Sequence, residues 1–130
     1  MLYSLLVLAT PWSGHSNRHA VLFAEGALAR GHRIRRVFFL DDGVSTGNSN
    51  VIYPQDEDSP VDIWLTLAQD HNVELVLCVS SALKRGLLNE TEAARRERTV
   101  ATTLPCFTVS GLGQLLEAGQ ESDRLVTFGG

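Results

Sequence analysis

Apolar residues in this chain form short continuous runs that alternate with longer segments in which they recur every three or four positions. Continuous apolar runs are typical of strands covered on both faces of a sheet, and they occupy positions 2–9, 33–40, 74–79, 107–110 and 124–128. Helical spacing or helix-forming composition occupies positions 17–30, 60–72, 80–86, 90–98 and 112–121. The pattern therefore predicts a repeated βα order.

The boundaries of these segments carry residues that favour helix starts and loops. Ser59 before Pro60 predicts an N-cap followed by proline at the first helical position, and Ser80 or Ser81 predicts the cap of a short helix. Residues 41–59 are predicted to form a turn and then a long polar loop. Loops of this length are typically functional, so we interpret the segment as a lid or partner-binding element.

Strands joined through helices return parallel, with right-handed crossovers. The sequence thus predicts an α/β fold in three layers, with a five-stranded, mainly parallel sheet and helices on both faces, as a single domain over residues 1–130. Reactive groups in such sheets lie beyond the carboxyl ends of the strands. That rule selects the loops at 10–16, 41–59, 78–81 and 110–113.

Composition narrows the function classes. The net charge is −4 and the isoelectric point is near 5.5, so we expect no direct binding of nucleic acid, which requires clustered Lys and Arg. The apolar run at 2–9 is too short for a signal peptide or a membrane span and has no basic region before it. We therefore expect a cytoplasmic protein, without membrane association, whose thiols Cys78 and Cys106 are reduced.

Cys78 follows a buried strand and precedes a predicted helix. Free amides at the start of that helix and the nearby cations Lys84 or Arg85 would lower the pKa of its thiol. The hydroxyls of Ser80 and Ser81 would alter its hydrogen bonding. Free cysteines are more often small buried hydrophobic residues, however, and position alone favours a structural role for Cys78.

The chain resembles the DsrE/TusD family of sulfur carriers over nearly its whole length. Four blocks in order carry the resemblance: Val37-Phe38-Phe39-Leu40-Asp41-Asp42-Gly43-Val44, Cys78-Val79-Ser80-Ser81-Ala82-Leu83-Lys84-Arg85-Gly86, Asn89-Glu90-Thr91-Glu92-Ala93 and Ser110-Gly111-Leu112-Gly113-Gln114-Leu115. The resemblance implies a DsrEFH-like, flavodoxin-related fold. It also favours a reactive Cys78 over a structural one, because the matching family cysteine accepts sulfur as a persulfide.

The resemblance further implies a heterohexamer with two smaller homologous subunits, similar to TusB and TusC or to DsrF and DsrH. It implies a TusA-like donor and a TusE- or DsrC-like acceptor. The Glu-Thr-Glu-Ala block is closer to the TusD branch, which serves 2-thiouridine synthesis in tRNA, than to the sulfur-oxidising Dsr branch. A non-catalytic assembly subunit or a small-molecule-binding subunit is the alternative of another class. Ser80 and Ser81 stand where the family commonly has alanine.

The remaining candidate residues favour structural interpretations. His15 and His19 are four positions apart but no further ligand follows, so we expect no metal site, and a role for His19 as acid or base stays open. The glycines Gly111 and Gly113 lack the third glycine of a dinucleotide fingerprint, so we expect no cofactor. Cys106 is predicted to be buried rather than to be a resolving thiol.

Four aromatic residues divide into two groups. Phe38, Phe39 and Trp64 have core-compatible spacing and are predicted to pack in the interior. Trp12 lies in the loop after the first strand, where it shields the thiol site or faces another subunit.

Overall fold

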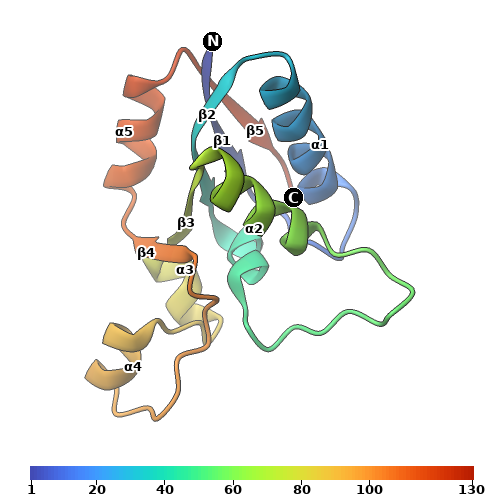
Figure 1. The fold of residues 1–130 in the computed structure, drawn as a ribbon. Helices are drawn as coiled ribbons and strands as arrows, with labels where there is room; N and C mark the ends of the chain where they lie inside the picture. The colour runs from blue at the N-terminus through green and yellow to red at the C-terminus, as the bar shows by residue number, and fades with distance from the viewer.

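The computed structural model describes residues 1–130 and has a sheet with helices on both sides (Figure 1). The strands are β1 (Leu2–Val7), β2 (Arg33–Phe39), β3 (Glu74–Cys78), β4 (Phe107–Ser110) and β5 (Arg124–Phe128). The helices are α1 (Ser16–Ala29), α2 (Pro60–His71), α3 (Val79–Lys84), α4 (Glu90–Arg95) and α5 (Gly113–Glu121), with a 3₁₀ helix η1 (Asp41–Gly47). The order of the elements confirms the predicted βα repeat.

All five strands are parallel, in the order β4-β3-β2-β1-β5. The chain moves outward from β1 to β4 and then crosses back to place β5 on the other side of β1. Because the crossovers have one hand, this reversal carries α5 to the face opposite α1 and α2. Figure 1 shows α5 and α1 on opposite sides of the sheet, which confirms the three-layer α/β prediction.

The core lies between the sheet and the pair α1 and α2. Phe38, Phe39 and Trp64 have no exposed surface, as predicted. The rings of Phe39 and Trp64 meet edge to face, with centroids 5.7 Å apart, a favoured geometry for aromatic pairs. These contacts fix α2 against β2, the strand beside β3.

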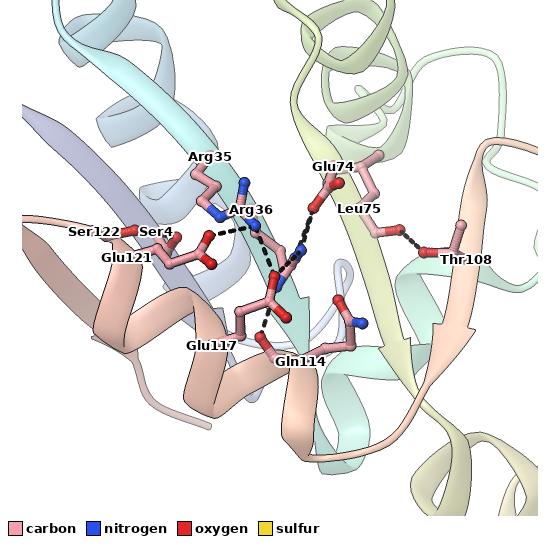
Figure 2. A network of polar contacts seen from close by, with 10 residues as sticks. All are labelled: Ser4, Arg35, Arg36, Glu74, Leu75, Thr108, Gln114, Glu117, Glu121 and Ser122. Atoms are coloured by element: carbon pink, nitrogen blue, oxygen red, sulfur yellow. Dashed lines mark hydrogen bonds and ion pairs between the residues drawn. The ribbon is translucent and has the colours of Figure 1, made fainter.

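An extra residue in β2 aims two arginines at the same helix. Tyr3 pairs with Ile34 and Ser4 pairs with Arg36, so Arg35 is an unpaired bulge residue. Neighbouring strand residues ordinarily point to opposite faces, but a bulge reorients one of them. The side chains of Arg35 and Arg36 consequently both reach α5 (Figure 2).

Arginines and glutamates join β2, β3 and α5 through ion pairs (Figure 2). Arg36 is 3 % exposed and its guanidinium lies 2.6 Å from Glu74 and 3.5 Å from Glu117. Arg35 lies 2.8 Å from Glu117 and 2.6 Å from Glu121. Glu117 is shared by the two arginines, so the network fastens α5 across the sheet.

The prediction of a long irregular loop after β2 is wrong for its first part. Residues 41–47 form η1, and Val44 and Thr46 within it are fully buried. Gly43 is needed because a Cβ atom there would collide with the backbone oxygen of Val7, and at Gly47 it would lie 2.6 Å from Leu77 Cδ1. Seven residues of 3₁₀ helix leave no helical period that the sequence could reveal.

Candidate functional site

Cys78 is the last residue of β3 and the N-cap residue of α3. Its backbone is extended (φ −63°, ψ 125°), and the helix begins at the next residue, Val79. The predicted cap at Ser80 or Ser81 is therefore wrong, since those residues lie inside the first turn. Cys78 pairs with Ser110 of β4 at the carboxyl edge of the sheet, the edge at which reactive groups of parallel sheets lie.

The sulfur of Cys78 lies just beneath the surface. Cys78 is 1 % exposed, but Ser80 is exposed and its Oγ lies 3.4 Å from Cys78 Sγ. An exposed residue therefore lies in direct contact with the buried thiol.

Burial raises the pKa of the Cys78 thiol. Hydrogen bonding from the hydroxyls and amides of Ser80 and Ser81 lowers it by more, so the pKa lies below its ordinary value. The amides make no cap hydrogen bond of ordinary geometry to the sulfur, so the contact with Ser80 Oγ is the best-formed of these interactions. Hydrogen bonds that favour the charged form are a standard cause of lowered pKa values. The surroundings of Cys78 therefore make its thiolate easier to form than that of an ordinary cysteine.

The cations predicted to act on the thiol do not contribute to its lowered pKa, because neither Lys84 nor Arg85 is among the causes of the shift. Arg85 Nε and Nη2 instead donate to Asp42 Oδ1 at 3.2 and 3.0 Å. Its Nη1 donates to the carbonyl oxygen of Ser81 at 3.1 Å. Arg85 thus joins Asp42 to the carbonyl oxygen of Ser81.

Ser81 connects the thiol to the end of β2. It is 5 % exposed, and its Oγ accepts a hydrogen bond of 3.0 Å from the backbone amide of Asp41. Asp41 has φ +51°, the left-handed conformation that Asp tolerates better than most residues. The turn predicted at Asp41 therefore also contacts Ser81, in the helix that begins next to Cys78.

Asn17 is a buried supporting residue that sequence reasoning missed. Its Nδ2 donates to Ala9 O at 3.0 Å and to Thr46 Oγ1 at 2.9 Å, and its Oδ1 accepts from Trp64 Nε1 at 3.0 Å. The side chain joins the loop after β1 to η1 and α2. The helical spacing could have indicated its burial, because Asn17 lies on the same helix face as the buried residue Ala20.

The family model described as DsrE/DsrF-like matches residues 1–128. The chain belongs to this family. It is 40% identical over 129 residues to DsrE of Allochromatium vinosum, with 99% of each chain covered. It is 43% identical over 125 residues to the sulfurtransferase TusD homolog of Pseudomonas aeruginosa, covering 96% of this chain and 95% of that one.

The fold of this DsrE/DsrF-like chain is shared with a more distant solved structure. The crystal structure of the YchN protein of E. coli superposes with a TM-score of 0.70 at 17% sequence identity, covering 98% of this chain and 99% of that one. This likeness extends to the fold and agrees with the all-parallel sheet.

The prediction that Cys106 is buried is wrong. Cys106 is exposed and lies in the loop just before β4. Four positions separate it from Ser110, the partner of Cys78, which is about 13 Å at about 3.3 Å per strand residue. A disulfide requires Cα atoms within about 7 Å, so Cys106 cannot bridge to Cys78 in this conformation.

The two histidines make no hydrogen bond to the Cys78 thiol, whose best-formed side-chain contact of this kind is with Ser80. His15 and His19 are exposed and stack on each other with ring centroids 6.0 Å apart, and no group of three metal-ligating side chains occurs in the structure. Trp12 is 54% exposed. No helix is long and apolar enough to cross a membrane.

Proposed function

We propose that this protein is a sulfurtransferase subunit that accepts sulfur as a persulfide on Cys78 and passes it to another protein. The observation that carries the proposal is the environment of Cys78, a thiol at the carboxyl edge of the sheet whose pKa is lowered by hydrogen bonding from Ser80 and Ser81. Relatives named DsrE and sulfurtransferase TusD support the same activity. Thiolates are the attacking species in such exchanges.

The transfer balances without an external oxidant. The Cys78 thiolate attacks the outer sulfur of a persulfide on a donor protein, the donor S–S bond breaks, and the donor leaves as a thiolate. A new S–S bond now holds the outer sulfur on Cys78, and transfer of the persulfide proton to the departing donor thiolate leaves Cys78 with an anionic persulfide. An acceptor thiolate attacks that outer sulfur in turn and releases the Cys78 thiolate. One cysteine suffices for both steps.

The hydroxyl of Ser80 suits this cycle because it lies 3.4 Å from Cys78 Sγ. In the thiolate it donates a hydrogen bond to sulfur, and rotation of this exposed side chain leaves room for the added atom. Ser81 is buried and held by Asp41, so it supports the site from the protein side.

We assign the relay to the cytoplasm and to 2-thiouridine modification of tRNA, within a heterohexamer containing two smaller homologous subunits. A TusA-like donor and a TusE- or DsrC-like acceptor would complete the relay. A DsrE-type role in sulfur oxidation is the second candidate, because identity to DsrE is 40% and identity to the TusD homolog is 43%. The small proteins that co-purify with this chain distinguish the two.

The proposal is tested by incubating the native complex with a protein persulfide donor and mapping the added sulfur by mass spectrometry. Parent protein and Cys106→Ser should each gain one sulfur atom on Cys78, whereas Cys78→Ser should gain none. Loading that persists in Cys78→Ser, or is lost only in Cys106→Ser, would refute the assignment. A parent protein that takes up no sulfur would support the non-catalytic alternative.

A further inference from the structure

Two adjacent aspartates after β2 reach α3 by different routes. The backbone amide of Asp41 donates to Ser81 Oγ at 3.0 Å. The carboxylate of Asp42 accepts from Arg85 at 3.0 and 3.2 Å, and Arg85 donates to the carbonyl oxygen of Ser81 at 3.1 Å. Both routes end on Ser81, whose hydroxyl is held from one side and whose carbonyl is held from the other.

The base of this arrangement is rigid. Gly43 and Gly47 of η1 approach Val7 and Leu77 so closely that neither has space for a Cβ atom. The segment that carries Asp41 and Asp42 is therefore fixed against the carboxyl ends of β1 and β3.

We infer that Asp42, acting through Arg85, is a positioning residue that holds Ser81 and the first turn of α3 in register with the Cys78 sulfur. The ion pair contributes little to stability, since the side chains of Arg85 and Asp42 are 31% and 68% exposed and exposed pairs are weak. Two donors of one guanidinium on a single carboxylate oxygen nevertheless restrict the orientation of Arg85. The inference rests on the proposed function for its purpose, but the geometry stands without it.

Orientation matters at Ser81 because a hydroxyl has a single proton to donate. Ser81 Oγ accepts from the Asp41 amide, and this bond leaves the hydroxyl proton of Ser81 unused. Hydrogen bonding from Ser81 is one of the causes that stabilise the Cys78 thiolate. A first turn that is free to shift would lose this alignment without unfolding.

The sign of the effect separates positioning from simple electrostatics. Asp42 is anionic, so removing its charge would favour the Cys78 thiolate if Asp42 acted through space. If Asp42 instead acts by holding Arg85 in place, loss of their hydrogen bonds would disfavour the thiolate. Asp41 supplies the matched control, because it also carries a negative charge but contacts Ser81 through its backbone amide.

The test measures the pH dependence of Cys78 alkylation by iodoacetamide in a Cys106→Ser background. Asp42→Ala should move the midpoint to higher pH and lower the rate at neutral pH about threefold, the scale of one weakened hydrogen bond. Asp41→Asn should leave the midpoint unchanged or move it slightly to lower pH. Asp42→Asn, which retains one acceptor oxygen, should lie between the parent and Asp42→Ala.

A double variant and a remote control complete the design. In an Arg85→Ala background, Asp42→Ala should raise the midpoint no further, because the two residues act as one unit. Arg95→Ala breaks an exposed pair with Glu92 on α4 and should leave the profile unchanged. Thermal unfolding by circular dichroism should show the same melting temperature within a few degrees in all variants.

A midpoint for Asp42→Ala equal to or below that of Asp41→Asn would overturn the positioning role. The outcome is separable from the proposed function, because alkylation reports on the thiol itself. Failure of the parent to accept sulfur would refute the carrier function alone.

Discussion

The two cysteines of this chain lie toward opposite ends of the β3–β4 pair and have opposite environments. Cys78 is 1 % exposed, yet its pKa is lowered because hydrogen bonding outweighs burial. Cys106 is exposed, yet its pKa is raised because the partial burial of its thiol is offset only by its own backbone. The donors arranged around the sulfur, rather than its exposure, therefore decide which thiol ionises more readily.

The difference follows from the direction of the strands. At the carboxyl edge β3 passes directly into α3, so the first-turn amides and hydroxyls of Ser80 and Ser81 lie beside the sulfur of Cys78. Cys106 precedes β4 and borders a groove of about 430 Å³ lined partly by Val73 and Val76. No comparable set of donors faces it.

The largest expected effect comes from altering η1, which packs against the carboxyl ends of β1 and β3. Gly43→Ala places a Cβ atom against the backbone oxygen of Val7, and overpacking against rigid backbone costs about 3 kcal/mol. Chemical denaturation should show this loss of stability. Gly111→Ala is the matched control, because nothing lies within 4 Å of its added Cβ atom, and an equal loss there would contradict the claim that this packing is specific to η1.

Truncating each thiol separates burial from exposure. Cys78→Ala removes a buried sulfur from the core cluster and should lower the free energy of unfolding by about 1 kcal/mol. Cys106→Ala should change it by less than about 0.5 kcal/mol, as is usual at the surface. Both values come from urea denaturation, and similar losses for the two variants would remove the structural basis of the comparison.

The smallest expected effect is at the hydroxyl of Ser80, which contacts the Cys78 sulfur. Ser80→Ala removes the contact at 3.4 Å, which should disfavour the thiolate and lower the alkylation rate of Cys78 at neutral pH about threefold, the scale of one hydrogen bond. Cys106 in the same sample is the internal control. A Cys78 profile that is unchanged after the substitution would exclude Ser80 from stabilising the thiolate.

Much of the fold follows from the sequence because continuous apolar runs and helical spacing mark the two kinds of element. All five strands are found where the pattern placed them. The bulge at Arg35 and the short helix η1 were missed, since each depends on tertiary contacts: a register with β1 in one case and close packing against Val7 and Leu77 in the other.

Some of the surroundings of Cys78 were predicted. The strand-to-helix junction at Cys78 follows from the sequence pattern and is found in the structure, whereas its role as a sulfur carrier was implied by the family resemblance and stays a prediction. The role of Arg85 was not evident, because its partner Asp42 lies 43 positions away in the chain. Cys106 was placed in the core on the general burial of cysteine, a tendency that does not apply to this loop residue.

The most direct test of the account follows both thiols of the parent protein in one experiment. Alkylation at a series of pH values, quantified for the peptides containing Cys78 and Cys106 by mass spectrometry, gives a midpoint for each thiol. A thiol with a lowered pKa reacts at lower pH, so the Cys78 midpoint should lie below that of a free cysteine and the Cys106 midpoint above it. Equal midpoints, or the reverse order, would contradict the claim that the carboxyl edge prepares Cys78 for chemistry.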